Sequence, residues 1–199
     1  MRILAFSDLH HARARAAALV QASGAADLVI GAGDFCNMRQ DLPAAMTLLS
    51  GIAAPMVVVP GNAESFDELA DAAHAGTTVL HGTGCQIGGL ALFGLGYGVP
   101  VTPFGAWSCD LSETDAAAML AMCKAADILI THSPPKGVAD RTSGGQSVGS
   151  VAVRDAINRI QPQLALCGHI HDSWGQEGMI GATRVVNLGP GGAWFEVTT

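Results

Sequence analysis

The chain has 199 residues, 49% of them hydrophobic and 14% charged, which suits one domain with a sizeable core and excludes a disordered or fibrous protein. Its formal net charge of −7 argues against a nucleic acid or membrane partner held by bulk electrostatic attraction. An anionic substrate remains compatible with this charge, because bound cations can reverse the sign of a local site.

Cysteine spacing and the N-terminal sequence bear on the compartment. The five cysteines are widely spaced without a C-x-x-C pair, which indicates reduced, mostly buried thiols. The N-terminus lacks the layout of a signal peptide, and no apolar run reaches the roughly 18 residues of a membrane span. We therefore expect a single domain over residues 1–199, located in the cytoplasm.

The first part of the chain predicts alternating strands and helices. Strands are expected at residues 2–7, 27–31 and 55–59, and helices at residues 12–22, 42–49 and 65–75. The last helix begins at a capping box, Ser65-Phe-Asp-Glu68. This alternation predicts right-handed crossovers and a largely parallel sheet.

Polar side chains follow each of these three strands. Asp8 and His10 come after the first, Asp34 follows Gly33, and Asn62 follows a Pro-Gly turn. Alone, Asp8 could be a cap and Asn62 a turn residue. Ligands of parallel sheets gather beyond the carboxyl ends of the strands, so we expect these side chains to lie together. If the backbone stays extended, Asp8 and His10 face the same side.

The middle of the chain changes character. Short strands at residues 77–80, 85–87 and 90–93 predict a meander that opens a second sheet. Residues 97–110 form a loop rich in Gly and Pro, expected to be a lid or rim over a site. Within it, Trp107 is expected to be a packing anchor rather than a substrate contact. A helix over residues 112–126 follows, capped by Ser112.

The last part of the chain contributes three histidines. A strand at residues 127–131 ends at His132, which two prolines follow, and a polar loop covers residues 137–149. A helix is expected at residues 151–160 and a buried strand at 163–168. His169 and His171 follow that strand and would face one point on an extended backbone, as metal ligands or as a hydrogen-bonded pair. Strands at 183–187 and 193–197 are expected to close the chain as a hairpin.

These residues form an ordered set. Five motifs each follow a predicted strand, in the order Asp8-x-His10, Gly33-Asp34, Gly61-Asn62, Thr131-His132 and Gly168-His169-x-His171. The set resembles the calcineurin-like metallophosphoesterase superfamily over residues 1 to about 190, most closely its small single-domain phosphodiesterase-type members. The resemblance implies an α/β fold in which two mixed sheets lie face to face with helices outside, a four-layer αββα sandwich.

The resemblance also implies two metal sites. Asp8, His10 and His171 would hold the first ion. Asn62, His132 and His169 would hold the second. Asp34 would bridge both ions, and Asp34, Asn62 and His132 are the residues to which catalysis is assigned. Imidazole and carboxylate ligands together favour Mn, Fe or Zn over Ca or Mg.

The chain departs from the family pattern at one position. The third motif of the family usually reads Gly-Asn-His followed by an acid, whereas this chain has Ala63 in place of the histidine. That histidine is thought to contact the phosphate and protonate the leaving group. None of the spare histidines, His11, His74 and His81, is a convincing replacement.

The resemblance implies a hydrolase in which a metal-bound hydroxide attacks a small phosphate ester, with phosphodiesters expected. Asn62 and Arg141 are the candidate substrate contacts. We expect no membrane partner, and nucleic acid only as small nucleotides, because basic residues are few. The alternative is a metal-holding regulatory or interaction module with weak residual hydrolysis, which Ala63 favours and the seven intact ligand positions oppose.

Overall fold

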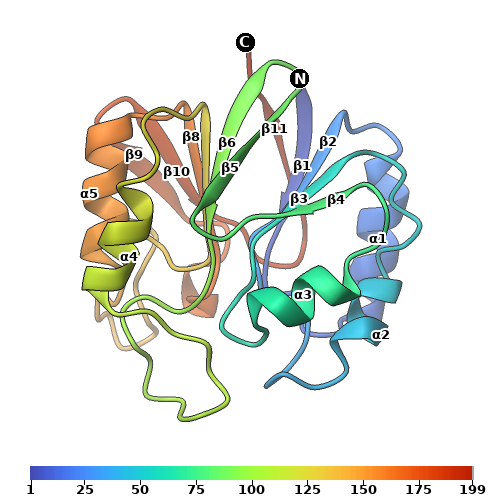
Figure 1. Cartoon of the computed structure of the whole chain (residues 1–199), viewed down its shortest axis with the longest axis horizontal. Coiled ribbons are helices and arrows are strands. Elements are labelled where there is room, and N and C mark those ends of the chain that lie inside the picture. The colour runs from blue at the N-terminus through green and yellow to red at the C-terminus, as the bar shows by residue number, and fades with distance from the viewer. Residues whose placement is uncertain (199) are drawn as a thin grey trace.

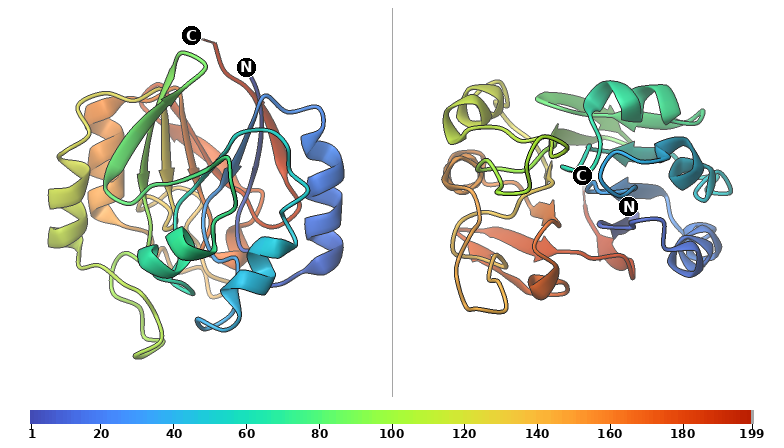
Figure 2. Two further views of the ribbon diagram at one scale, coloured as in Figure 1. Left: turned by 45° about the vertical axis from the view of Figure 1, so that its right-hand side comes forward. Right: turned by 90° about the horizontal axis from the view of Figure 1, so that it is seen from below.

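The computed structural model describes residues 1–198 and consists of two β-sheets packed face to face between two layers of helices (Figure 1). The four layers are also visible from below, where helices flank the strands on both sides (Figure 2). The predicted αββα sandwich is therefore confirmed.

One sheet has five strands in the order β11-β1-β2-β3-β4. Strands β1 to β4 are parallel, and β11 pairs antiparallel with β1. The strands are β1 (Arg2–Phe6), β2 (Leu28–Gly31), β3 (Met56–Val58), β4 (Thr77–Val79) and β11 (Ala193–Glu196). The connecting helices are α1 (Arg13–Ser23), α2 (Leu42–Thr47) and α3 (Phe66–Ala72). The predicted capping box starts α3, because the Ser65 hydroxyl accepts from the Glu68 N–H and the Glu68 carboxylate accepts from the Ser65 N–H.

The second sheet has six strands in the order β5-β6-β7-β8-β10-β9. Its central strands β6, β7, β8 and β10 are parallel, and β5 and β9 are antiparallel edge strands. The strands are β5 (Thr83–Ile87), β6 (Leu90–Leu95), β7 (Ile128–Thr131), β8 (Leu164–Cys167), β9 (Glu177–Ile180) and β10 (Thr183–Asn187). Helices α4 (Glu113–Leu120) and α5 (Val151–Ile160) cover its outer face, and a short 3₁₀ helix spans His171–Ser173.

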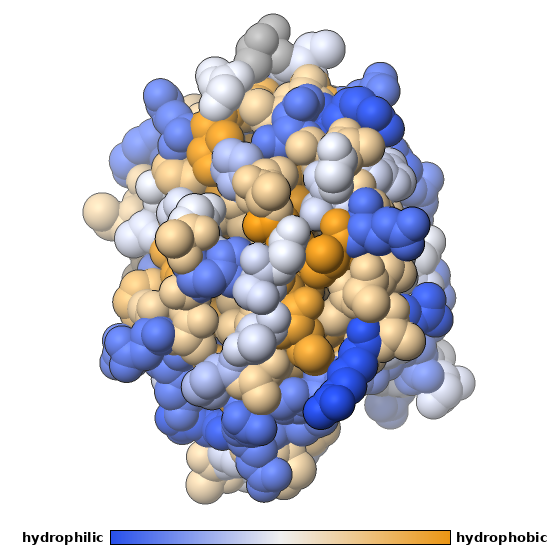
Figure 3. Space-filling model, turned by 90° about the vertical axis from the view of Figure 1, so that its right-hand side faces the viewer, coloured by the Kyte–Doolittle hydropathy of each residue, from blue (hydrophilic) through white to orange (hydrophobic). Residues whose placement is uncertain are grey.

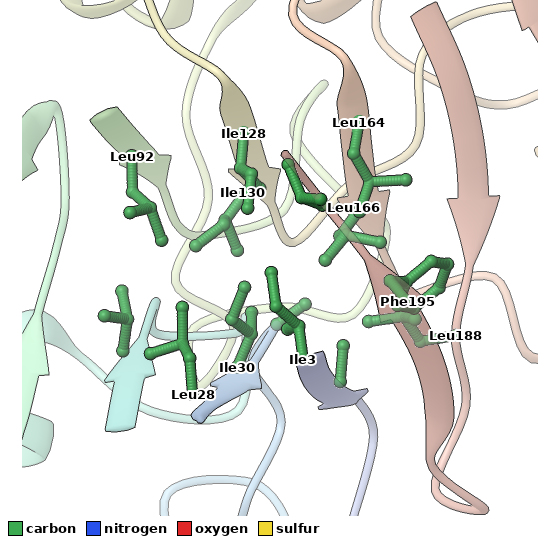
Figure 4. Close-up of a cluster of buried hydrophobic side chains, with 14 of the residues drawn as sticks. Ile3, Leu28, Ile30, Leu92, Ile128, Ile130, Leu164, Leu166, Leu188 and Phe195 are labelled. Atoms are coloured by element: carbon green, nitrogen blue, oxygen red, sulfur yellow. The ribbon is translucent and has the colours of Figure 1, made fainter. Parts of the chain in front are cut away.

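The core lies in three layers of buried side chains. Between the sheets, aliphatic side chains from both sides meet, among them Ile3, Ile30, Ile130 and Leu166 (Figure 4). A second cluster packs the five-stranded sheet against α1 to α3, and a third packs the six-stranded sheet against α4 and α5. Because both of their faces are buried, the central strands β1, β2, β3, β7 and β8 are nearly continuous in hydrophobic residues, and polar side chains collect at their ends.

Three sequence expectations about the elements are wrong. Strand β4 joins the first sheet beside β3 rather than opening the second. The chain does not close as a hairpin, because β10 and β11 lie in different sheets, and the hairpin is formed by β9 and β10. Helix α4 ends at Leu120 instead of continuing to residue 126. The Arg159 guanidinium donates to the carbonyls of Leu120 and Cys123 and so satisfies this helix end.

The outer helices face solvent. On the side of the molecule that faces right in Figure 1, hydrophobic side chains form a narrow strip bordered by hydrophilic ones (Figure 3). Within residues 1–198, no helix has the length and apolarity that crossing a bilayer requires.

Candidate metal centre

Seven polar side chains meet where the parallel strands of the two sheets end. They come from the segments that follow β1, β2, β3, β7 and β8, and they are Asp8, His10, Asp34, Asn62, His132, His169 and His171. The sequence predicted that these positions converge, and the structure brings all of them together. Convergence at one edge is the first requirement of a shared metal centre.

The local backbone differs from the sequence expectation. Asp8, His10, Asp34 and His169 all have positive φ angles, between 44° and 68°. The condition of an extended backbone, under which Asp8 and His10, and His169 and His171, would face one side, is therefore not met. Left-handed backbone is unfavourable for residues other than glycine and is concentrated at functional sites. Its occurrence at four of these positions indicates that the surrounding structure holds them in place.

Two glycines permit the close approach of the loops. A Cβ atom on Gly33, which has φ +90°, would lie 2.6 Å from the backbone of Gly61 and 2.7 Å from Nδ1 of His132. A Cβ atom on Gly61 would overlap the Asp34 carboxylate. Side chains at these positions would separate the loops that carry Asp34, Asn62 and His132.

The first group of possible ligands consists of Asp8, His10 and His171. Nε2 of His10 lies 3.3 Å from Nε2 of His171, which in turn lies 3.7 Å from Oδ1 of Asp8. Asp8 is buried, whereas the side chains of His10 and His171 are 24% and 49% exposed. An ion held here would be reachable from solvent.

The second group consists of Asp34, His132 and His169. Nε2 of His132 lies 3.4 Å from Oδ1 of Asp34 and 3.2 Å from Oδ1 of Asn62. The other oxygen of Asp34, Oδ2, lies 3.5 Å from Nε2 of His10, which belongs to the first group. Asp34 therefore lies between the two groups and directs one oxygen toward each.

Hydrogen bonds fix which imidazole nitrogens face the centre. Nδ1 of His132 donates to the carbonyl of Ala32 at 2.8 Å, and Nδ1 of His10 donates to the carbonyl of Cys36 at 2.9 Å. A neutral ring with its proton at Nδ1 has a lone pair at Nε2. In the second group, Nε2 of neutral His132 would direct this lone pair toward the oxygens of Asp34 and Asn62, which are also acceptors. A cation among them would satisfy all three, so the donor set fits a metal ion.

The pKa values of His132 and Asp34 also indicate that positive charge is stabilised at the centre. Burial acts to lower the pKa of His132, but the Asp34 carboxylate outweighs it and raises the pKa to about 9. Burial acts to raise the pKa of Asp34, but His132 and the neighbouring imidazoles hold it well below its usual range. Burial lowers the pKa of His169 to about 3, and the charge on His132 adds to this effect. In the metal-free protein, a proton on His132 therefore supplies part of the positive charge that a cation would bring.

An open cavity of about 300 Å³ leads to the centre. It is lined by His10, Asp34, Asn62, His169 and His171, together with Phe104 and Trp107 from the loop of residues 97–110. This loop projects below the sheets in Figure 1. Trp107 packs against the cluster beneath α1 to α3 and also lines the cavity, so it is both the expected anchor and a wall of the site. The expectation of a rim over the site is confirmed.

Other candidate residues lie outside the cavity. The Arg141 guanidinium donates to the carbonyl of Gly145 within its own loop, and Arg141 does not line the cavity. His11 contacts the carbonyl of Gln40, and His81 accepts from the N–H of Gly96. His74 contacts its own segment, at Ala75 and Thr77. None of the three spare histidines lines the centre.

The sequence did not reveal the residues that hold the ligands in position. Trp174 Nε1 and Ser7 Oγ both donate to Oδ2 of Asp8, at 2.9 and 2.6 Å. The N–H of His169 donates to the other oxygen of Asp8. Trp174 lies three residues after His171 and its ring is 4.3 Å from that imidazole, but nothing in the sequence alone marked it as a partner of Asp8.

Glu64 is a second positioning residue that the sequence did not identify. It is fully buried, and its carboxylate accepts hydrogen bonds from the N–H groups of Gly61, Asp34 and Phe35. Burial, with the charge of Asp34, raises its pKa to about 7. One buried carboxyl group therefore ties the segment after β2 to the segment after β3.

Two stacked sheets with carboxylate, amide and imidazole groups gathered at one edge are the arrangement expected of a metallophosphoesterase. The chain belongs to the calcineurin-like phosphoesterase superfamily, because the model of the calcineurin-like phosphoesterase superfamily domain matches residues 1–198. The family resemblance of the five motifs is thereby confirmed.

Individual proteins are similar to this chain to different extents. TT1561 of Thermus thermophilus is 21% identical with a TM-score of 0.76, over 96% of this chain and 90% of that one. A dimetal phosphatase from Danio rerio is 11% identical with a TM-score of 0.63, over 96% and 88%. Human metallophosphoesterase domain-containing protein 1 is 37% identical over 84 residues, 40% of this chain and 26% of that protein. The matches to curated relatives span 13% to 33% of the relatives' own length.

Proposed function

We propose that this protein hydrolyses small phosphate esters, phosphodiesters in particular, with two divalent cations held by the seven clustered side chains. The observation that carries the proposal is the position of Asp34, with one carboxylate oxygen toward each group of possible ligands. Mn, Fe or Zn suits the mixture of imidazole and carboxylate donors. When bound, such a pair of ions supplies an activated water and neutralises charge on the phosphoryl oxygens.

The residues of the chain fix the geometry in which this chemistry would occur. Oδ1 of Asp34 accepts the N–H of Ala63 at 2.8 Å, which sets the rotation of the bridging carboxylate. The amide of Asn62 donates to Ser108 Oγ, so its oxygen points toward His132. Phe104 and Trp107 provide apolar walls beside a bound ester. The carboxylates and imidazoles are thus held before a substrate arrives.

The size of the cavity and the charge of the chain limit the substrate. A volume of about 300 Å³ is at the lower end of the range for small-molecule sites, and the formal net charge is −7. Both support a small phosphate ester over a long nucleic acid. We further propose that residues 1–199 act as one domain in the cytoplasm. The pairing of the last strand, β11, with the first, β1, supports a single domain. The five free cysteines support a cytoplasmic location.

Turnover of bis(p-nitrophenyl) phosphate with added Mn²⁺ tests the proposal. We expect turnover that a chelator removes and Mn²⁺ restores, and that His132→Gln abolishes. His11→Gln is the matched control, because His11 lies outside the cavity. A metal-holding module without chemistry would bind Mn²⁺ but give no turnover, and that outcome would reject the proposed function.

Ala63 predicts a preference among substrates. Ala63 has no ionisable group, is 1% exposed, packs in the cluster beneath α1 to α3 and does not line the cavity, so this position supplies no general acid. Assistance by a general acid is worth about 10²–10⁴ in rate, and its absence penalises poor leaving groups most. We expect activated aryl diesters to be hydrolysed about 100-fold or more faster than alkyl monoesters. Comparable kcat/KM values for the two classes would show that another group donates the proton.

Proton release should accompany metal binding. With a pKa of about 9, His132 is protonated at pH 7, whereas only the neutral ring binds metal. Mn²⁺ affinity should therefore rise as the pH is raised from 6 to 9. Calorimetry in buffers of different ionisation enthalpy should show about one more proton released by the wild type than by His132→Gln. Equal proton counts for the two proteins would contradict the assignment.

The raised pKa of His132 also makes the metal-free protein less stable as the pH rises. Because the pKa of His132 is raised from 6.5 to about 9 in the folded state, its contribution is fully present below pH 6.5. That contribution is lost as the pH rises through 9. Bound metal replaces the proton, so we expect the holoprotein to lose less stability over this range.

A further inference from the structure

A second cavity adjoins the metal centre and has a different chemical character. Its volume is about 370 Å³, larger than the cavity at the centre, and the two share Phe104 and His169 as walls. The remaining lining is mostly apolar and comes from three segments: residues 99–103, Thr142 with Val148, and Ile170 after β8.

The hydroxyl groups in this lining are already engaged. Thr102 Oγ1 donates to Asp110 and lies within hydrogen-bond distance of Ser108 Oγ. Thr142 Oγ1 accepts from the N–H of Gln146. Apart from these two threonines and the shared His169 ring, the lining is aliphatic or aromatic, so the cavity has little to recognise a charged or strongly polar group.

Apolar side chains at the mouth are exposed to water. Val101 is 63% exposed and Phe104 is 50% exposed. The Phe104 ring stacks on Trp107, with 5.7 Å between ring centroids and 6° between ring planes, and meets the His169 ring edge-on at 6.4 Å. Phe104 thus forms the boundary between the polar centre and the apolar cavity. Because Phe104 and His169 line both cavities, a group attached to a phosphoryl group at the centre would lie next to the apolar cavity.

We propose that the second cavity binds an apolar ester group, aryl or alkyl, of the phosphate ester that occupies the metal centre. This inference rests on the proposed function and defines its substrate class. The occupant belongs to the substrate rather than to a partner protein, because the cavity adjoins the centre and shares Phe104 and His169 with it as walls. Val101 is then a specificity-determining residue.

Binding of two non-hydrolysable phosphonates tests the inference without turnover. Methylphosphonate and phenylphosphonate share the group that the centre would bind and differ in apolar surface. We expect calorimetry on the Mn²⁺-loaded protein to give phenylphosphonate a Kd about tenfold lower or more, from burial of the ring. Equal Kd values would overturn the inference and leave the proposed function standing. Failure of both compounds to bind would mean that the loaded centre does not hold a phosphoryl group and would reject the proposed function.

An uncharged substitution at Val101 tests whether the phenyl ring of phenylphosphonate lies in the second cavity. Val101→Asn keeps the charge of the protein, so methylphosphonate should bind with unchanged Kd. The ratio of the methylphosphonate Kd to the phenylphosphonate Kd should fall about threefold, because the ring loses an apolar contact. Met122→Asn is the matched control, because Met122 is 70% exposed and lies outside both cavities. A preference that Val101→Asn leaves intact would place the ring against Trp107 instead and would overturn the inference. Val148→Asn provides a second, independent variant in the opposite loop.

Discussion

Asp34→Asn should lower the metal content of both sites and reduce kcat for an aryl diester by at least about 100-fold. The reason is geometric. Oδ1 of Asp34 lies 3.4 Å from Nε2 of His132, and Oδ2 lies 3.5 Å from Nε2 of His10. An amide keeps the shape of the carboxylate but removes the negative charge and gives one of the two positions a donor in place of an acceptor.

His10→Ala is the informative comparison, because His10 belongs to the first group alone. We expect elemental analysis to show loss of about one ion per chain in His10→Ala and loss from both sites in Asp34→Asn. Asp71→Asn, an exposed position on α3, should keep full metal content and activity. Full occupancy of both sites in Asp34→Asn would exclude the bridging role.

Glu64→Ala should destabilise the metal-free protein by about 2–4 kcal/mol. The substitution leaves the N–H groups of Gly61, Asp34 and Phe35 without their acceptor, and each unpaired buried donor costs about 1–3 kcal/mol. Part of this cost is offset, because burial of the carboxyl group is itself unfavourable, as its raised pKa of about 7 indicates. Urea denaturation of the metal-free variants measures the difference.

Glu68→Ala is a suitable control for Glu64→Ala. Glu68 is a nearby acid whose side chain is 38% exposed. Its carboxylate pairs with Arg39 and completes the capping box of α3. Its removal should cost less than about 1 kcal/mol. A loss of less than about 1 kcal/mol for Glu64→Ala as well would mean that the segments after β2 and β3 are not held together by this carboxyl group.

The sequence predicted local features of the fold better than non-local ones. The capping box at Ser65 is set by neighbouring residues, and the structure has it. The pairing of β11 with β1 joins residues about as far apart in the chain as possible, and no local pattern encodes it. The early end of α4 depends on Arg159 from another helix, so residues 121–126 read as helical from propensity alone.

In the candidate site, too, the sequence predicted some features, whereas others depend on contacts between distant segments. Strand ends indicated that Asp8, His10, Asp34 and Asn62 lie together, and the family resemblance of the five motifs implied the full set of seven residues. Their backbone conformations could not be predicted, since the left-handed turns at Asp8 and His169 depend on contacts with other segments. Phe104 and Trp174 were missed as parts of the site for the same reason: each reaches it from a loop whose course is set by tertiary contacts.

Anomalous diffraction from crystals equilibrated with Mn²⁺ tests the central claim most directly. We expect two manganese peaks on opposite sides of the Asp34 carboxylate, one beside His10 and His171 and the other beside His132 and His169. A single peak, peaks remote from Asp34, or no peak at saturating Mn²⁺ would contradict the claim.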